Sequence, residues 1–382
     1  MEALSVVHYS AATWLLSRKR RWTSCGRADY RLRRLAPPPE KRLRERAADS
    51  QPHGTAAWSG VTDDGKEAAM ANIKIAEATR TAQPASRPAV TVVVVSDYVE
   101  ARQKSWTDER AVLRALGEQD FLESFEVILM ENGTVQGSTP ADLLSRCPGS
   151  RMEFSEATTS AELKDAGVMR ANGELIAILE ADCVPAPDWL RHMVSALRER
   201  PDYAAASGKT LYPGRSMFVR CLTLLDRSVY PGGSGPTASI SNNNSIVRRG
   251  VLDRYPYPAT PSPFLSAALR WREMQRDGLR FFFESHAIVY HALPSWSFIK
   301  DMRTHVGYSW GAQGESNFRT VLGGLTRGLY YDIMRCWRLR RHYAVAAHEL
   351  PLAYALAVVV KFYEFKGARY AQKRGLPRTA YR

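Results

Sequence analysis

The sequence predicts an α/β fold with an open, largely parallel sheet, and three observations carry this prediction. Apolar runs recur at residues 90–95, 125–130 and 175–179, where apolar side chains follow one another instead of alternating with polar ones. Such a run is typical of a strand buried on both faces. Stretches of helical character at 107–119 and 161–171 separate the runs. Strand and helix therefore alternate, which is the pattern of an open α/β sheet.

Composition excludes several other classes. The 382 residues are 45% hydrophobic and 24% charged, which is ordinary globular composition rather than that of a fibrous or low-complexity chain. The five cysteines form no C-x-x-C pair, so the sequence does not indicate a zinc ribbon or a thioredoxin-like redox site. We expect reduced thiols in the cytoplasm. The longest apolar stretch, residues 350–360, is about half of what a membrane-spanning helix needs. No P-loop or G-x-G-x-x-G pattern follows the first strand.

Positive charge is concentrated at the two ends of the chain. Residues 1–88 carry 16 basic and 9 acidic side chains, and residues 300–382 carry 15 and 5. Between them, residues 89–299 carry 22 basic and 25 acidic side chains. A nucleic-acid enzyme more often has a basic folded core. Basic ends on a neutral core favour contact with an anionic membrane surface, and the alternative is that they are solvated tails.

The chain divides into three predicted parts. Residues 1–88 are predicted to be a disordered basic extension and linker, because no apolar period persists there. Residues 89–315 are predicted to form the folded α/β domain. Residues 316–382 are predicted to be a helical basic tail in which aromatic and basic residues mix. That mixture favours helices in a membrane interface, and the alternative is helices packed on the domain.

Acidic residues follow each of the three predicted strands. Asp97 and Glu100 follow the first, Glu131 the second, and Glu180 and Asp182 the third. Ligands of open α/β sheets bind beyond the carboxyl ends of the strands, so these acids are expected to share one crevice. Clustered carboxylates repel one another unless a cation lies among them, and carboxylate oxygen suits Mg²⁺ or Mn²⁺. A metal site is therefore expected there.

Several segments together resemble the family-2 glycosyltransferases, which have the GT-A fold, a Rossmann-like open sheet that binds nucleotide-diphospho-sugars. The resemblance covers roughly residues 89–315. Its most specific part is A-N-G-E-L-I-A-I-L-E-A-D-C-V-P-A-P-D-W-L at 171–190, which is similar to the family's segment around its D-x-D motif. The other segments are 93–100, 125–134, 164–167, 241–249, 278–291 and 296–311.

The resemblance implies a role for each matching residue. Asp182 would be the catalytic carboxylate that holds the metal, with His291 as a further metal ligand. Glu180 stands at the first acid of the D-x-D motif. Arg248 and Arg249 would face the donor or acceptor, or form a solvated pair. The nucleotide-sugar would be bound by Tyr98, Glu100, Glu131, Lys164 and Glu180.

The implied activity is that of a metal-dependent hexosyltransferase. It would move a sugar from a nucleotide-sugar donor to a hydroxyl of an envelope glycan, polysaccharide or lipid-linked acceptor, with inversion. Mg²⁺ or Mn²⁺ would be the cofactor, and nucleic acid would not be a partner. The expected location is cytoplasmic, peripheral at the inner face of the membrane.

One departure from the family pattern bears on catalysis. An inverting transfer needs a base to take the acceptor proton, and residues 261–267, where the family has an acidic pair, contain no carboxylate. Asp253 and Glu284 are the remaining candidates by position, and otherwise they are surface acids. The alternatives are therefore a catalytically degenerate protein that binds nucleotide-sugar or glycan, and a basic membrane- or nucleic-acid-binding protein on an α/β scaffold.

Overall fold

The computed structural model describes residues 87–96, 105–313 and 318–373. The predicted disordered extension and the site residues Tyr98 and Glu100 therefore lie outside the described residues, apart from positions 87 and 88 of the extension. The strands are β1 (Val90–Val95), β2 (Phe125–Asn132), β3 (Ser150–Ser155), β4 (Leu175–Glu180), β5 (Cys183–Pro185), β6 (Tyr203–Leu211), β7 (Gly235–Thr237), β8 (Asn244–Arg248) and β9 (Arg280–His291). The helices are α3 (Thr107–Gly117), α4 (Ser160–Arg170), α5 (Trp189–Arg198), α6 (Met217–Arg227), α7 (Arg249–Arg254), α8 (Pro263–Arg276), α9 (Trp296–Ala312), α10 (Phe318–Leu339) and α11 (Leu350–Lys373).

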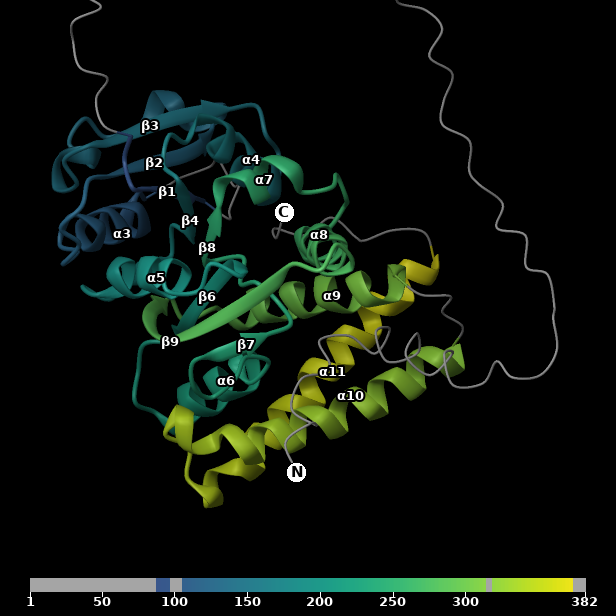
Figure 1. The fold of residues 1–382 in the computed structure, drawn as a ribbon. Coiled ribbons are helices and arrows are strands. Elements are labelled where there is room, and N and C mark those ends of the chain that lie inside the picture. The colour runs from purple at the N-terminus through teal and green to yellow at the C-terminus, as the bar shows by residue number, and fades with distance from the viewer. Residues whose placement is uncertain (1–86, 97–104, 314–317, 374–382) are drawn as a thin grey trace, which may run out of the picture. The chain divides into compact units, whose positions relative to one another are not determined.

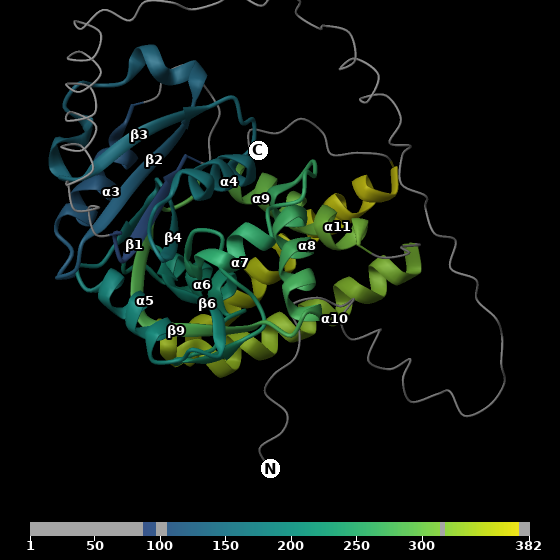
Figure 2. The same ribbon diagram turned by 45° about the horizontal axis from the view of Figure 1, so that its top comes forward.

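One mixed sheet organises the described part of the chain (Figures 1 and 2). Its order is β3-β2-β1-β4-β8-β6-β9-β5, and β7 pairs with β9 beside this path. Strands β3, β2, β1 and β4 run parallel, and β8 lies antiparallel between β4 and β6. Because β9 runs parallel to β6 and antiparallel to β5, its last residue reaches the edge where β4 ends.

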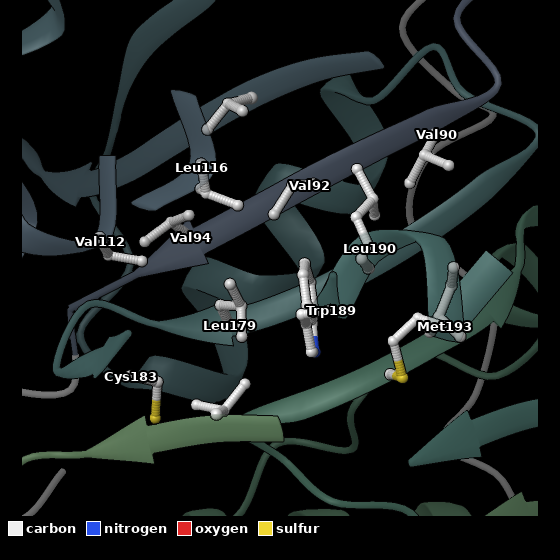
Figure 3. Close-up of a cluster of buried hydrophobic side chains, with 14 of the residues drawn as sticks. Val90, Val92, Val94, Val112, Leu116, Leu179, Cys183, Trp189, Leu190 and Met193 are labelled. Atoms are coloured by element: carbon white, nitrogen blue, oxygen red, sulfur yellow. The ribbon is translucent and has the colours of Figure 1, made fainter. Parts of the chain in front are cut away.

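Helices cover both faces of the sheet, which explains the uninterrupted apolar strands. Alternate residues of β1, such as Val92 and Val94, pack in one core with α3 and α5, where Trp189 is fully buried (Figure 3). The residues between them, Val93 and Val95, belong to a second core with α4, α7 and α8. The prediction of strands buried on both faces is therefore confirmed.

The sequence predicted the first half of the sheet better than the second. Strands β1, β2 and β4 and helices α3 and α4 lie within about two residues of their predicted ends. The run Phe281–Phe283 lies inside β9 as strand core, as expected. Strands β3, β5, β6 and β8 were not predicted, because their segments mix polar and small residues and show no sustained period.

The C-terminal region is helical, as predicted, and its helices pack on the domain. A third core joins α6, α9, α10 and α11 around Ile299, Cys336 and Leu356. Helices α9 and α11 approach so closely that a Cβ atom at Gly307 would stand 1.9 Å from the carbonyl oxygen of Glu364. No helix within the described ranges combines the length and the apolarity needed to cross a bilayer. Contact with a membrane surface stays a prediction that rests on the basic ends.

The close contact between α9 and α11 predicts opposite effects for two glycine substitutions. Gly307→Ala should destabilise the protein by roughly 1–3 kcal/mol, because backbone must move to accept the added methyl group. Gly323→Ala, in α10, should stabilise it by about 1 kcal/mol, because the new Cβ meets no atom of the described residues within 4 Å beyond its own helical turn and alanine favours a helix. Urea unfolding of both variants measures the difference, and equal effects would contradict this packing.

Candidate functional site

The carboxyl end of β4 carries the acidic pair, and strand pairing brings His291 to it. The amide of Ala181 donates to the carbonyl of Val95, so the chain leaves β4 beside the end of β1. Strand β5 follows at once and pairs with β9, with Cys183 opposite His291. The amide of Ala292 donates to the carbonyl of Asp182 at 2.8 Å. Residues more than a hundred positions apart in the sequence thus meet at one point.

Four side chains converge at this edge of the sheet. One ligand atom from each of Glu180, Asp182, Cys183 and His291 lies within 4.8 Å of the others. The Nδ1 atom of His291 lies 2.7 Å from the carbonyl oxygen of Ala292. A carbonyl only accepts, so Nδ1 donates this hydrogen bond, and Nε2 is the ring nitrogen that lies 3.5 Å from the Asp182 carboxylate. With Nε2 unprotonated, this nitrogen and the carboxylate can both bind one cation.

Glu180 and Asp182 differ in how their charge is compensated. The ammonium group of Lys164, on α4, donates to Glu180 at 2.7 Å, and both side chains are buried. Burial alone would raise the pKa of Glu180, but Lys164 and then His291 hold this pKa below its ordinary value. Burial raises the pKa of Asp182 above its ordinary value, against the opposing effect of His291. Of the two carboxylates, Asp182 is the one that no lysine or arginine of the described residues contacts.

The donor set fits a hard divalent cation. Carboxylate oxygen together with one imidazole nitrogen suits Mn²⁺ or Mg²⁺. Burial and the neighbouring acids keep the pKa of the Cys183 thiol well above its ordinary value, so this sulfur stays protonated and is a poor ligand. The hydrogen bond from Nδ1 to a backbone carbonyl is the usual way in which a ligating histidine is oriented. Asp182 and His291 are the two residues best suited to hold the ion.

Two other predicted nucleotide-binding residues are engaged with neighbouring side chains. Glu131 is buried at the end of β2 and accepts from the hydroxyl of Ser96 at 2.7 Å, while Glu109 lies 2.8 Å from the same hydroxyl. Lys164 is 2% exposed, and its contact with Glu180 places it one layer below the crevice. Both residues lie at the expected edge of the sheet, where the ends of β1, β2 and β4 are in register.

Four other residues singled out in the sequence lie away from this cluster. Arg248 pairs with Leu175 at the amino end of β4, and its guanidinium donates to backbone carbonyls, as does that of Arg249. Asp253 is exposed on α7, and Glu284 accepts from Ser234 and from the amide of His286. The two arginines therefore support the backbone at the opposite edge, and neither acid lines the cavity described next.

A cavity of about 530 Å³ extends from His291 to the C-terminal helices. This volume lies within the range of small-molecule sites. Phe264, at the start of α8, lines the cavity in the segment where the resemblance leads one to expect an acidic pair. Rings line much of the cavity wall: Tyr212, Tyr230, Phe264, Trp271, Phe298, Trp310 and Tyr331.

The three acids that line this cavity all pair with cations. Arg303 contacts both Asp226 and Glu364, and Lys361 contacts both Asp332 and Glu364 at 2.8 and 2.6 Å. The mixture of aromatic and basic residues in 322–341 and 361–374 indicated a membrane interface, so Asp332, Lys361 and Glu364 were missed. Asp226 and Arg303 carry no local signal in the sequence. The same mixture also suits the wall of a polar cavity, and only the packing of α9, α10 and α11 distinguishes the two.

Comparison with known proteins agrees with this geometry. The model of the family described as Glycosyl transferase family 2 matches residues 109–222. Those residues carry the pattern of a family-2 glycosyltransferase. The matched segment contains Lys164, Glu180 and Asp182 and ends before His291. The resemblance inferred from the sequence is therefore confirmed over this part of the chain.

Two individual proteins are similar to this chain, one in structure and one in sequence. A mannosyltransferase from Pyrobaculum calidifontis, solved in complex with GDP-Man and Mn²⁺, superimposes with a TM-score of 0.50 at 16% identity, over 81% of this chain and 96% of the other. That likeness confirms the GT-A fold. An uncharacterized protein of Sinorhizobium fredii is 30% identical over 110 residues, which are 27% of this chain. The match spans 12% of that relative's length.

The pair between Lys164 and Glu180 predicts a pH-dependent loss of stability. Lys164→Met should cost roughly 3–5 kcal/mol near neutral pH, because it leaves the Glu180 charge buried without its partner. Without Lys164 the pKa of Glu180 rises, so protonation at acidic pH removes the buried charge and the deficit relative to wild type shrinks.

Denaturant unfolding at about pH 7.5 and about pH 5 tests this expectation. The double variant Lys164→Met/Glu180→Gln is the matched control, and it should recover part of the lost stability because no charge remains to be buried. A deficit that does not change with pH, and that the double variant does not relieve, would contradict the account.

Proposed function

We propose that the protein transfers a sugar from a nucleotide-sugar donor to a hydroxyl of an acceptor, with a divalent cation at Asp182 and His291. The observation that carries this proposal is the approach of the Nε2 atom of His291 to the Asp182 carboxylate, 3.5 Å apart just beyond the carboxyl end of β4. Its support is the family-2 pattern around Asp182 and the fold shared with a mannosyltransferase solved with GDP-Man and Mn²⁺.

The cation's part in the chemistry would be to offset the negative charge on the donor diphosphate. Asp182 and His291 hold it, and the backbone bond from Ala292 to Asp182 fixes the distance between the strands that carry them. Glu180 stays ionised because Lys164 contacts it, so it can accept hydrogen bonds from a donor hydroxyl. Glu131, at the end of the neighbouring strand, would lie near the nucleoside.

The cavity beyond His291 is the proposed acceptor site. It ends at the metal ligand, so a hydroxyl held there would stand close to the sugar of a bound donor. Its aromatic wall suits the apolar faces of a glycan or the apolar part of a lipid-linked acceptor. Transfer with inversion would follow from direct attack by that hydroxyl.

A second candidate function is binding of a nucleotide-sugar without transfer. The observation that favours it is the pairing of Asp226, Asp332 and Glu364, the three acids of the cavity wall, with arginine and lysine. A carboxylate held in an ion pair is a weaker general base. Turnover distinguishes the two functions, because both predict metal-dependent binding of the donor.

Asp182→Asn should abolish metal-dependent donor binding and lower transfer or donor hydrolysis by about 10²- to 10³-fold or more. The amide keeps the shape of the side chain but loses the charge that the cation needs. Thermal stabilisation by a panel of nucleoside diphosphates and nucleotide-sugars, with and without Mn²⁺, measures binding. Product analysis with the stabilising donor measures turnover.

Asp188→Asn is the matched control, because Asp188 lies six residues further on, is partly exposed and pairs with Arg191 and His192. It should leave both binding and turnover unchanged. Donor stabilisation without Mn²⁺, or an Asp182→Asn variant that responds like the wild type, would refute the proposed metal site. Binding without any product would favour the second candidate.

A further inference from the structure

Arg227, at the end of α6, lines the cavity without a carboxylate partner among the described residues, and in this it differs from two other cavity arginines. Arg303 and Arg335 each contact a carboxylate. Within the described residues, no carboxylate lies within ion-pair distance of Arg227, and this distinguishes it. Its buried Nε atom makes no hydrogen bond, a feature that it shares with Arg335. The adjacent carboxylate of Asp226 is already taken by Arg303 and by the hydroxyl of Tyr212.

Geometry places this guanidinium beside the proposed metal site. The ring of Tyr212 lies edge-on to the ring of His291, with 5.6 Å between their centroids. The same ring lies 5.5 Å from the Cζ atom of Arg227. Arg227 and His291 both line the one cavity.

Arg227 is partly buried, its Nε atom is fully buried, and no carboxylate of the described residues pairs with its guanidinium, so an anion would satisfy it. Leaving a buried N–H group without a partner costs free energy, more so on a charged group. Planar guanidinium donors match phosphate oxygens in pairs. The neighbouring cluster is the place where the proposed function puts a diphosphate, which supplies those oxygens. Arg227 is thus positioned to reach a diphosphate bound beside His291.

We propose that Arg227 donates hydrogen bonds to the terminal phosphate of the leaving nucleoside diphosphate. This inference rests on the proposed function and adds a leaving-group residue to it. During transfer the bond from the anomeric carbon to the diphosphate oxygen breaks, and its electron pair stays on that oxygen. The acceptor oxygen forms the new bond, and its proton is released to water. The released terminal phosphate therefore carries more negative charge than the bound donor.

Charge balance explains why a second cation is needed there. A divalent ion is partly neutralised by Asp182, and the charge of Glu180 is offset by Lys164. The charge that develops on the diphosphate as the bond breaks is then left for another group to offset. An interaction that strengthens as this charge grows accelerates the step, whereas one of constant strength only tightens binding.

Binding of the product tests the inference without relying on turnover. The nucleoside diphosphate that most stabilises the wild type with Mn²⁺ is titrated by calorimetry, together with its monophosphate. Arg227→Met should weaken diphosphate binding about 10- to 100-fold, because charge-assisted hydrogen bonds are lost. Monophosphate binding should change less than about twofold, since it lacks the terminal phosphate.

Three further variants sharpen the result. Arg227→Gln repeats the loss of charge with a second side chain, in case the methionine variant does not fold. Arg227→Lys keeps the charge without the planar donors and should fall between the wild type and Arg227→Met. Arg198→Met removes an exposed arginine at the end of α5 that pairs with Glu123, and it should not change binding.

Diphosphate affinity equal to that of the wild type in a folded Arg227→Met or Arg227→Gln variant would overturn the inference and leave the proposed function standing. Equal weakening for diphosphate and monophosphate would also overturn it, because the arginine would then support the site as a whole. A wild type that binds no nucleoside diphosphate with Mn²⁺ would overturn the proposed function, and this inference with it.

Discussion

The cost of burying two carboxylates at the end of one strand governs this structure. Glu180 and Asp182 are separated by a single residue, and both side chains are buried. Like charges repel strongly there, and removing each charge from water costs free energy. Helix α4 brings Lys164 to Glu180 and so offsets its charge, and β9 brings the Nε2 atom of His291 within 3.5 Å of Asp182. The remaining charge deficit at Asp182 is what a divalent cation would supply.

The second half of the molecule is arranged around that edge. Strands β8, β6 and β9 extend the sheet beyond β4, and the pairing of β9 with β5 fixes His291 opposite Cys183. Helices α6, α9, α10 and α11 then enclose the cavity that starts at His291. Their buried ion pairs hold the cavity wall, so nearly every charge there has a partner. In the described part of the chain, Arg227 differs because no carboxylate lies within ion-pair distance of it.

Sequence predicted the elements whose signal is local. The valines of β1 and the apolar run of β4 are continuous because both faces are buried, and the acids after them are read directly from the sequence. His291 was found through the resemblance, not from spacing. Sequence could not predict that Arg227 and Asp226 line the cavity, because their surroundings depend on which helices pack together. For the same reason the sequence did not predict that Arg248 and Arg249 donate to backbone carbonyls distant in sequence instead of facing the donor or acceptor.

Anomalous diffraction at the manganese edge, from crystals grown with Mn²⁺ and the stabilising nucleoside diphosphate, tests the central claim most directly. The account predicts a manganese peak within coordination distance, roughly 2 Å, of both the Asp182 carboxylate and the Nε2 atom of His291. The diphosphate oxygens should be bound to the same ion. A peak elsewhere in the crevice, or a diphosphate bound with neither residue near the ion, would contradict it.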